Sequence, residues 1–344
     1  MQLEGKRIVI TGGTGSLGQA LTRRLLTGEM GKPAKVIIFS RDEAKQHALR
    51  LSYLQRANAT DEIIYDSSRG ILTFMIGDIR DYASVQRAIG NVDVIFNAAA
   101  LKQVPTCEYF PFEAVQTNIV GAQNLVRAIR ENGRCAELVV GISTDKACKP
   151  VNVMGMTKAL QERIFVNANR GQGHTNYLCV RYGNVIASRG SVIPLFQEQI
   201  AKGGPVTITT KEMTRFLLTL DQAVDTIFAA VRGGGRGETY IPRAPAARVV
   251  DIADVMIDNR NIRVEFTGIR PGEKTHEILV SEEELSRTTE RDGYYVIHPI
   301  VPELRTETVD IPALTAEYSS REITLDRPAL SKLLASAEYA HAVA

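Results

Sequence analysis

The sequence predicts an α/β protein with a doubly wound parallel sheet and a smaller α/β domain toward its C-terminus. Three observations support this fold class: short apolar runs alternate with amphipathic stretches in the first half, a glycine-rich turn follows the first run, and the alternation stops near residue 185. Unbroken apolar runs suit strands that are covered on both faces, and the amphipathic stretches suit crossover helices. A chain of 344 residues also exceeds the usual size of one domain, so we expect two domains that share a cleft.

The large sheet is expected to contain six strands from the first half of the chain. Their predicted ranges are 7–11, 35–39, 72–76, 93–98, 137–143 and 176–182. Between them, residues 121–132 ("GAQNLVRAIREN") are typical of a crossover helix. Strands alternating with helices in this way predict a Rossmann-like fold.

Glycine and proline recur after residue 185, and only a few helical segments remain. Residues 219–232 predict a helix opened by Asp221, and residues 238–242 ("ETYIP") predict a strand that rejoins the large sheet. The large domain is therefore assigned residues 1–185 with a returning segment at about 213–244. The smaller, ligand-binding domain is assigned residues 186–212 and 245–344.

Composition excludes several classes of function. The chain has 41 basic and 39 acidic residues, a net charge of +2 and no basic block, so we expect no nucleic-acid partner. The first residues lack the form of a signal peptide, and no segment approaches the ~18 apolar residues of a membrane helix. We therefore predict a cytoplasmic protein that does not bind membranes. The four cysteines form no CxxC pair, which predicts reduced thiols and no metal site.

The glycine-rich turn "TGGTGSLG" (11–18) directly follows the first strand and opens a helix. A turn without side chains lets a pyrophosphate approach the backbone and rest on the helix N-terminus. The alternative is a tight turn without a ligand, which the flanking strand and helix make the weaker interpretation. The predicted dinucleotide-contacting residues of this turn are Gly12, Thr14, Gly15, Ser16, Leu17 and Gly18.

The end of the second strand indicates which dinucleotide is bound. Ser40 and Arg41 offer a hydroxyl and a guanidinium suited to the 2′-phosphate of NADP, where NAD-binding folds usually offer a carboxylate. NADP is favoured over NAD, although Asp42 could still reach a ribose. The ends of the third and fourth strands add the further predicted cofactor contacts Asp78, Ile79, Ala98, Ala99 and Ala100.

A series of motifs across nearly the whole chain resembles the UDP-N-acetylglucosamine 4,6-dehydratases of the extended short-chain dehydrogenase/reductase superfamily. They include "TGGTGSLG", "AAALKQVPTCEY", "STDKA", "RYGNVIASRGSVIPLF", "MTRF" and "IRPGEKTHEIL". The resemblance implies a redox-neutral reaction, in which hydride leaves carbon 4 of the sugar, water is eliminated across carbons 5 and 6, and hydride returns to carbon 6. It also implies a role in bacterial surface-glycan sugar biosynthesis and a homo-oligomer.

The predicted chemistry lies in "STDKA", at the carboxyl end of the fifth strand. The resemblance assigns Lys146 to removal of the carbon-5 proton and Asp145 to protonation of the departing hydroxyl, and adjacent opposite charges can separate their pKa values. The alternative is an ion pair that only caps the strand. A tyrosine usually deprotonates the carbon-4 hydroxyl, but Met154 occupies its position, so we expect Asp145 or a water held by Thr144 to take that proton.

Lys158 lies four residues after Met154 and so on the same helical face. The resemblance implies that it holds the nicotinamide ribose, whereas Met154 would only fill space. An alternative is a catalytically inactive protein that senses NADP.

Residues of the second half are expected to hold UDP-N-acetylglucosamine or a related UDP-sugar, since arginine matches phosphate oxygens in pairs. The resemblance implies the substrate contacts Lys102, Asn184, Arg189, Val192, Arg215, Arg270 and Glu273. Inversion at carbon 5 is favoured over retention. A UDP-sugar 4-epimerase is a further alternative, although it normally keeps the tyrosine.

Overall fold

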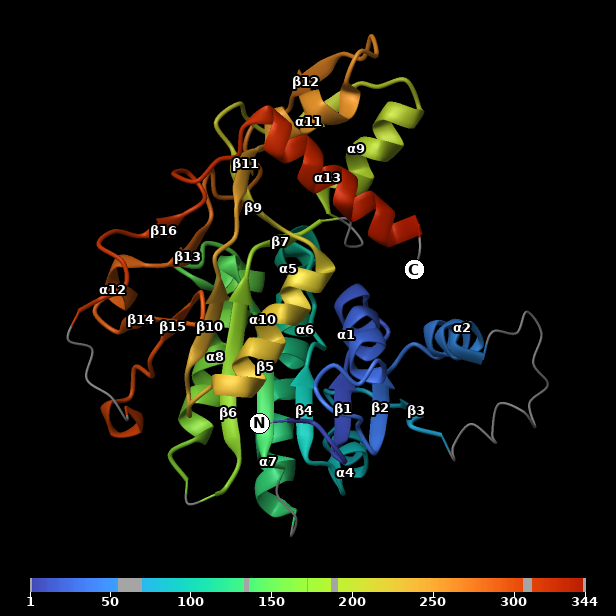
Figure 1. Ribbon diagram of the computed structural model, residues 1–344, viewed down its shortest axis with the longest axis vertical. Helices are drawn as coiled ribbons and strands as arrows, with labels where there is room; N and C mark the ends of the chain where they lie inside the picture. The colour runs from blue at the N-terminus through green and yellow to red at the C-terminus, as the bar shows by residue number, and fades with distance from the viewer. Residues whose placement is uncertain are drawn as a thin grey trace.

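A nine-stranded sheet forms the centre of the large domain, in the lower part of the molecule (Figure 1). The computed structural model describes residues 2–54, 70–132, 136–171, 173–186, 191–305 and 311–342. The sheet order is β14-β15-β10-β6-β5-β4-β1-β2-β3, with every pairing from β10 to β3 parallel. The strands are β1 (Arg7–Thr11), β2 (Lys35–Ser40), β3 (Leu72–Ile76), β4 (Val94–Asn97), β5 (Leu138–Thr144), β6 (Asn176–Tyr182), β10 (Thr239–Pro242), β14 (Thr288–Arg291) and β15 (Tyr294–Ile297).

Helices cover both faces of this sheet (Figure 1). On one face, α1 (Ser16–Leu26) packs against α10 (Leu220–Gly233). On the other, α7 (Gly121–Glu131) packs against α4 (Tyr82–Ile89) and α8 (Val153–Ala168), while α2 (Glu43–Leu54) contacts β2 and β3 near the sheet edge. The predicted doubly wound Rossmann-like fold is confirmed.

The apolar runs are unbroken because both faces of the strands are buried. Along β1, Ile8 and Ile10 belong to the core beneath α1 and α10, whereas Val9 belongs to the core beneath α4 and α7. Alternate side chains of a strand point to opposite faces, so a strand with helices on both sides is apolar at every position.

The smaller domain lies above the carboxyl ends of the parallel strands (Figure 1). Ile193, Phe196 and Ile252 lie in its separate core. Its elements are β7 (Asn184–Val185), α9 (Val192–Ala201), β8 (Val206–Ile208), β9 (Thr214–Leu218), β11 (Ala246–Arg248), α11 (Val249–Ile257), β12 (Val264–Phe266) and α13 (Arg327–Ala342). Of these, β7 and β9 lie in ranges that the sequence assigned to the large domain. Further elements of the second half are β13 (Ile278–Val280), α12 (Glu282–Leu285) and β16 (Tyr318–Ser319), and Leu279, Val280 and Tyr318 pack in the core of the large domain.

Two details of the second half differ from the sequence expectations. The helix predicted to open at Asp221 is capped two residues earlier, because Thr219 and Gln222 form a reciprocal capping box. The strand at "ETYIP" does return to the large sheet as β10, but β14 and β15 then extend that sheet by antiparallel pairing. These two strands lie in the range assigned to the smaller domain, and the division into domains stays a prediction.

The described helices were also compared with the dimensions of a bilayer. None of them combines the length and the apolar character needed to cross a membrane.

Candidate functional site

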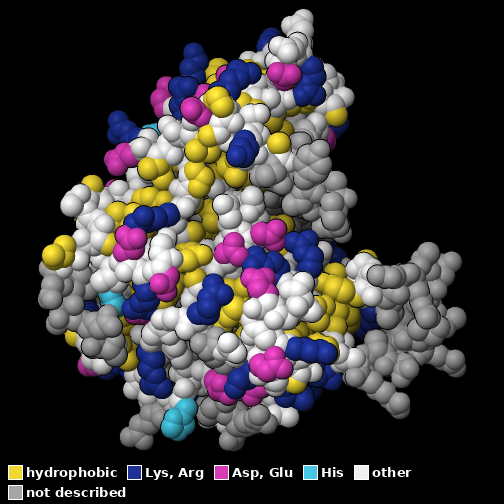
Figure 2. Space-filling view, viewed as in Figure 1, with side chains coloured by type: hydrophobic (Ala, Val, Ile, Leu, Met, Phe, Trp, Pro, Cys, Tyr) yellow, Lys and Arg dark blue, Asp and Glu magenta, His cyan; other side chains and the backbone are white. Residues whose placement is uncertain are grey.

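A cleft of about 850 Å³ separates the carboxyl ends of the parallel strands from the smaller domain. Open α/β sheets bind their ligands at this edge. Figure 2 shows apolar side chains along the junction of the two domains on the face turned to the viewer. Of the predicted residues within the described chain, the cleft is lined by Gly12, Gly15, Ser16, Leu17, Gly18, Ala98, Ala99, Ala100, Lys102, Thr144, Lys146, Met154, Lys158, Asn184, Val192, Arg215, Arg270 and Glu273.

The glycine turn leaves one wall of this cleft without side chains. Gly12 has a φ of 66°, and a Cβ added there would lie 2.7 Å from the backbone nitrogen of Ala99. A Cβ on Gly18 would lie 2.5 Å from the Cα of Gly13, so the close approach of helix and turn also requires glycine. Gly15 caps α1, whose first residues line the cleft. This bare helix N-terminus fits a pyrophosphate.

The end of β2 presents a cation beside a carboxylate. Arg41 is 58% exposed, and its Nη1 lies 3.9 Å from Oδ2 of Asp78. Asp42 accepts a hydrogen bond from the backbone N–H of Lys45 at 2.9 Å and also pairs with its ammonium group. Asp42 and Arg41 thus each have an oppositely charged partner, and the Arg41 guanidinium is the more exposed of the two groups.

The other predicted cofactor residues outside the cleft wall are mostly buried. Ser40 is buried, and its hydroxyl accepts a hydrogen bond from Gln46 at 3.1 Å. Thr14 and Ile79 are buried as well, so their side chains support the turn and the strand ends from below.

The "STDK" stretch places three side chains in contact at the end of β5. The Thr144 hydroxyl donates to Oδ1 of Asp145 at 2.9 Å, and Nζ of Lys146 lies 3.0 Å from the same oxygen. Thr144 and Lys146 line the cleft, but Asp145 is fully buried behind them. A proton from the cleft can therefore reach Asp145 through the Thr144 hydroxyl.

A fourth side chain, Glu277, completes this cluster. Its Oε1 lies 2.9 Å from Nζ of Lys146 and 3.8 Å from Nε of Arg215, and its side chain is 2% exposed. Sequence analysis missed Glu277 although it lies in the quoted stretch "IRPGEKTHEIL". A single glutamate before a short strand has no periodicity or spacing that would reveal a contact with a residue 131 positions earlier.

The electrostatics of the cluster favour a charged lysine at rest. Burial lowers the pKa of Lys146, but the carboxylates of Asp145 and Glu277 outweigh it, so its pKa is raised. Burial would raise the pKa of Glu277, but Lys146 and Arg215 hold it below its usual value. For Asp145, burial prevails over the attraction of Lys146, and its pKa is raised. Lys146 thus rests as an ammonium beside ionised Glu277, and Asp145 is the carboxylate more prone to accept a proton.

Met154 and Lys158 lie on α8, whose start packs on the turn that carries Lys146. A Cβ on Gly155 would lie 2.2 Å from the Lys146 carbonyl oxygen, so this close packing needs glycine next to Met154. Met154 is buried with Cys107 and Ala114. Nζ of Lys158 donates to Oε1 of Gln161 at 2.7 Å and to the Ile142 carbonyl.

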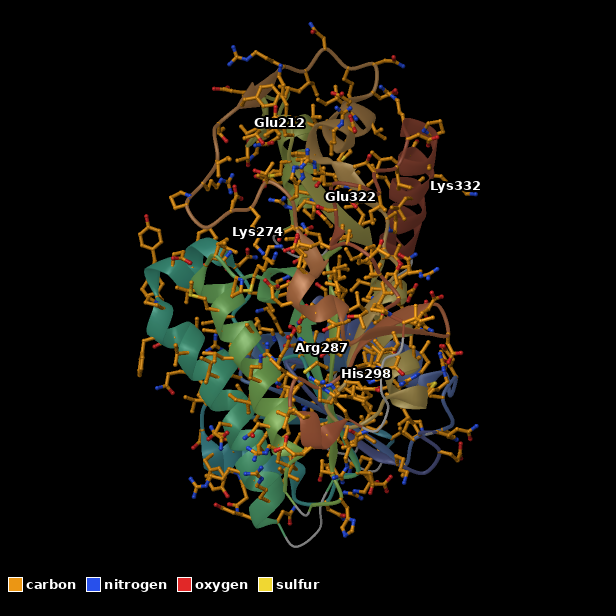
Figure 3. All side chains as sticks on the ribbon, turned by 90° about the vertical axis from the view of Figure 1, so that its left-hand side faces the viewer. Glu212, Lys274, Arg287, His298, Glu322 and Lys332 are labelled. Carbon is orange, nitrogen blue, oxygen red and sulfur yellow. The ribbon has the colours of Figure 1, made fainter. Side chains whose placement is uncertain are left out.

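The predicted substrate residues of the described chain line the cleft from several segments, with Lys102 on the sheet side. Asn184 accepts from Nζ of Lys146 at 3.3 Å, and the guanidinium of Arg215 is held by the carbonyls of Thr214 and Thr275. Figure 3 shows Lys274, from the same segment as Glu273, at the junction between the two domains. Arg189 lies outside the described residues.

A buried ion network fixes the elements behind the site. Arg181 of β6 pairs with Glu162 of α8 and Glu284 of α12 at 2.7 Å each. Arg287 reaches Glu284 from the other side, near His298 (Figure 3). The network ties the helix that carries Lys158 to the segment that follows Glu277.

Comparison with known proteins decides the family. The family model described as "Polysaccharide biosynthesis protein" matches residues 8–299. The chain belongs to this polysaccharide biosynthesis family. A curated relative named UDP-glucose 4-epimerase, from Rickettsia akari, is 43% identical over 297 residues, which cover 85% of this chain and 82% of the relative.

Solved structures of other proteins share the fold. The X-ray structure of Pen from Bacillus thuringiensis has a TM-score of 0.86 and 34% identity, covering 98% of this chain and 99% of Pen. The dTDP-glucose 4,6-dehydratase DesIV from Streptomyces venezuelae, solved with NAD and TYD bound, has a TM-score of 0.66 and 22% identity over 78% of this chain and 86% of DesIV. The latter likeness concerns the Rossmann-type fold alone.

Proposed function

We propose that this family member removes water from UDP-N-acetylglucosamine and yields UDP-2-acetamido-2,6-dideoxy-hexos-4-ulose, a 4-keto-6-deoxy sugar nucleotide. The observation that carries this proposal is the position of Lys146, held in the cleft between two buried carboxylates. Elimination needs a base for carbon 5 and an acid for the departing hydroxyl, both within reach of one sugar. The "STDK" turn and Glu277 supply both kinds of group at the carboxyl edge of the sheet.

NADP is the proposed cofactor. The bare glycine turn fits its pyrophosphate, Arg41 suits a 2′-phosphate, and Lys158 would hold the nicotinamide ribose. When bound, NADP would take hydride from carbon 4 and return it to carbon 6.

The chain's own residues then divide the proton transfers. Thr144 and Asp145 would take the proton of the carbon-4 hydroxyl, because the threonine hydroxyl faces the cleft and donates to the raised-pKa carboxylate. Asp145 would later return that proton to the hydroxyl that leaves carbon 6. Lys146 would remove the carbon-5 proton, which the new ketone makes acidic. Met154 has no proton to exchange and would only fill space.

The uridine diphosphate would lie along the smaller domain. Arg215 and Arg270 line the cleft there and suit its phosphates, and Lys102 lies on the sheet side, where the sugar would be. We propose inversion at carbon 5 rather than retention, and a role in surface-glycan sugar biosynthesis.

A homo-oligomer is proposed as well. Exposed aromatic side chains on α5 (Val104–Tyr109) and α6 (Pro111–Ala114) adjoin exposed apolar side chains on α8, and these helices pack together. The exposed residues of this face are Tyr109, Phe110, Phe112, Met156 and Leu160. Apolar faces of this kind mark protein interfaces. Phe112→Asp should lower the mass measured by light scattering, and an unchanged mass would exclude this face.

A UDP-sugar 4-epimerase is the second candidate, because the Rickettsia akari relative carries that name. An epimerase also oxidises carbon 4, but it needs no base at carbon 5. The cluster around Lys146 would then have no task.

The test is the mass of the product. Purified protein with UDP-N-acetylglucosamine and NADP should yield a product lighter by one water, without net accumulation of NADPH. A product of unchanged mass would indicate the epimerase. Tight NADP binding without any product would indicate a sensor.

A further inference from the structure

Lys146 is held by three acceptors at once. Its Nζ lies 3.0 Å from Oδ1 of Asp145, 2.9 Å from Oε1 of Glu277 and 3.3 Å from Oδ1 of Asn184. An ammonium group has three N–H donors and no acceptor, so all three donors are in use. In this arrangement Lys146 has no lone pair with which to accept a proton, and it must lose a proton before it can act as a base.

Two carboxylates are within reach of that proton. Asp145 is engaged with the Thr144 hydroxyl, the path to the cleft, through the same oxygen that contacts Lys146. In the proposed reaction Asp145 already holds the carbon-4 proton at this stage, so Glu277 is the carboxylate left to accept a proton from Lys146. Within the described part of the chain, its Oε2 is buried without a hydrogen-bond partner, as is Oδ2 of Asp145, so each carboxylate has an oxygen that can receive a proton.

The backbone holds Glu277 firmly in place. Its N–H donates to the Ser320 hydroxyl at 2.9 Å, and its carbonyl accepts from the Ser320 N–H at 2.9 Å. Two hydrogen bonds to one residue fix the segment before β13, so the carboxylate is presented to Lys146 from a rigid position.

We propose that Glu277 takes one proton from Lys146 and thereby frees the lysine amine to remove the carbon-5 proton. This inference rests on the proposed dehydration. Glu277 acts through Lys146 and not on the sugar, so it is a positioning residue that holds a proton. The transfer turns a buried ion pair into two neutral groups, which removes the desolvation cost of both charges but also their mutual attraction, so the neutral pair is transient.

The protons balance over one turnover. The carbon-4 hydroxyl gives its proton through Thr144 to Asp145 as the carbon-4 hydride departs. Lys146 passes one proton to Glu277, and its amine takes the carbon-5 proton while the C6–O bond breaks and Asp145 protonates the departing oxygen to water. After hydride returns to carbon 6, carbon 5 takes a proton from water on the opposite face, as inversion requires, while Lys146 releases its proton to solvent in the cleft and recovers the one held by Glu277.

Charges around Glu277 support its return to the ionised form. Burial would keep the carboxyl neutral, but Lys146 and Arg215 lower its pKa whenever Lys146 is an ammonium. The proton therefore moves back once the lysine needs it.

The test compares Glu277→Gln with Glu277→Asp and with Glu322→Gln, a glutamate exposed at the surface (Figure 3). Each protein receives NADP and UDP-N-acetylglucosamine in deuterated water. Rapid mixing follows the transient NADPH absorbance, which reports carbon-4 oxidation, and mass spectrometry follows deuterium uptake at carbon 5.

Glu277→Gln should oxidise carbon 4 at the wild-type rate but lose about 100-fold or more in carbon-5 exchange. Glu277→Asp should recover part of that exchange, and Glu322→Gln should match the wild type.

Three results would overturn the inference. The first is carbon-5 exchange at the wild-type rate in Glu277→Gln. The second is an equal loss of carbon-4 oxidation and carbon-5 exchange in that variant, which a structural defect would give. The third is the same carbon-5 exchange rate in Glu277→Gln and Glu277→Asp. Should Glu277→Gln fail to fold, Glu277→Ala with added formate provides the same test, and an absence of rescue counts against the proposal. Failure of the proposed function is visible separately, because the wild-type protein itself would then release no water.

Discussion

Replacement of Met154 by leucine is expected to leave turnover near the wild-type rate. The methionine is 5% exposed and packs with Cys107 and Ala114 in a small apolar cluster. Leucine has a similar volume, so the free energy of unfolding should fall by less than ~1.5 kcal/mol. Alanine would leave a cavity and should cost ~2–5 kcal/mol. Neither change removes a group that titrates.

Urea denaturation and product formation, both measured with NADP present, provide the assay. Met154→Leu and Met154→Ala should differ in their free energy of unfolding, but both should retain turnover under conditions in which they are folded. Met154→Tyr should not raise turnover, because a phenol hydroxyl buried without a partner costs ~1–3 kcal/mol. If Met154→Leu folds, binds NADP and yet makes no product, the sulfur or its shape takes part in the reaction and the space-filling role is wrong.

Three further substitutions test the cofactor site and the buried charges. Arg41→Ala should weaken NADP binding by ~1.5–3 kcal/mol in calorimetry and NAD binding much less, and an equal loss for both would count against NADP. Burial lowers the pKa of Lys158 from 10.5 to about 8, so between pH 8 and pH 10.5 the lysine is protonated only in the unfolded chain. The free energy of unfolding should therefore rise with pH in this range by up to ~1.4 kcal/mol per pH unit. Lys158→Met should flatten this rise. Arg181→Met should lower the unfolding free energy by ~3–5 kcal/mol in urea because two carboxylates stay buried unpaired, whereas the exposed Lys202→Ala should change it by less than ~0.5 kcal/mol.

The sequence was informative where local pattern determines structure. The six predicted strands are present because burial on both faces requires apolar residues at every position, as Ile8, Val9 and Ile10 illustrate. The glycine turn was equally clear, because Gly12 and Gly18 stand where a Cβ would meet backbone atoms. Such constraints act within a few residues or repeat along an element.

Local sequence patterns do not predict contacts between segments that are far apart in the chain. Asp221 does lie in the first turn of its helix, but the Thr219 capping box decides where the helix begins. The pairing of β14 with β15 depends on a neighbour in the sheet that the local sequence does not specify. Glu277 matters through one ion pair with Lys146, and a single residue carries no pattern.

The fate of the carbon-4 hydrogen tests the dehydration most directly. UDP-N-acetylglucosamine that carries deuterium on carbon 4 should give a product that has lost water and carries the deuterium in its carbon-6 methyl group, as nuclear magnetic resonance and mass spectrometry would show. Deuterium that stays on carbon 4 of a product of unchanged mass would contradict the proposed reaction and indicate epimerisation instead.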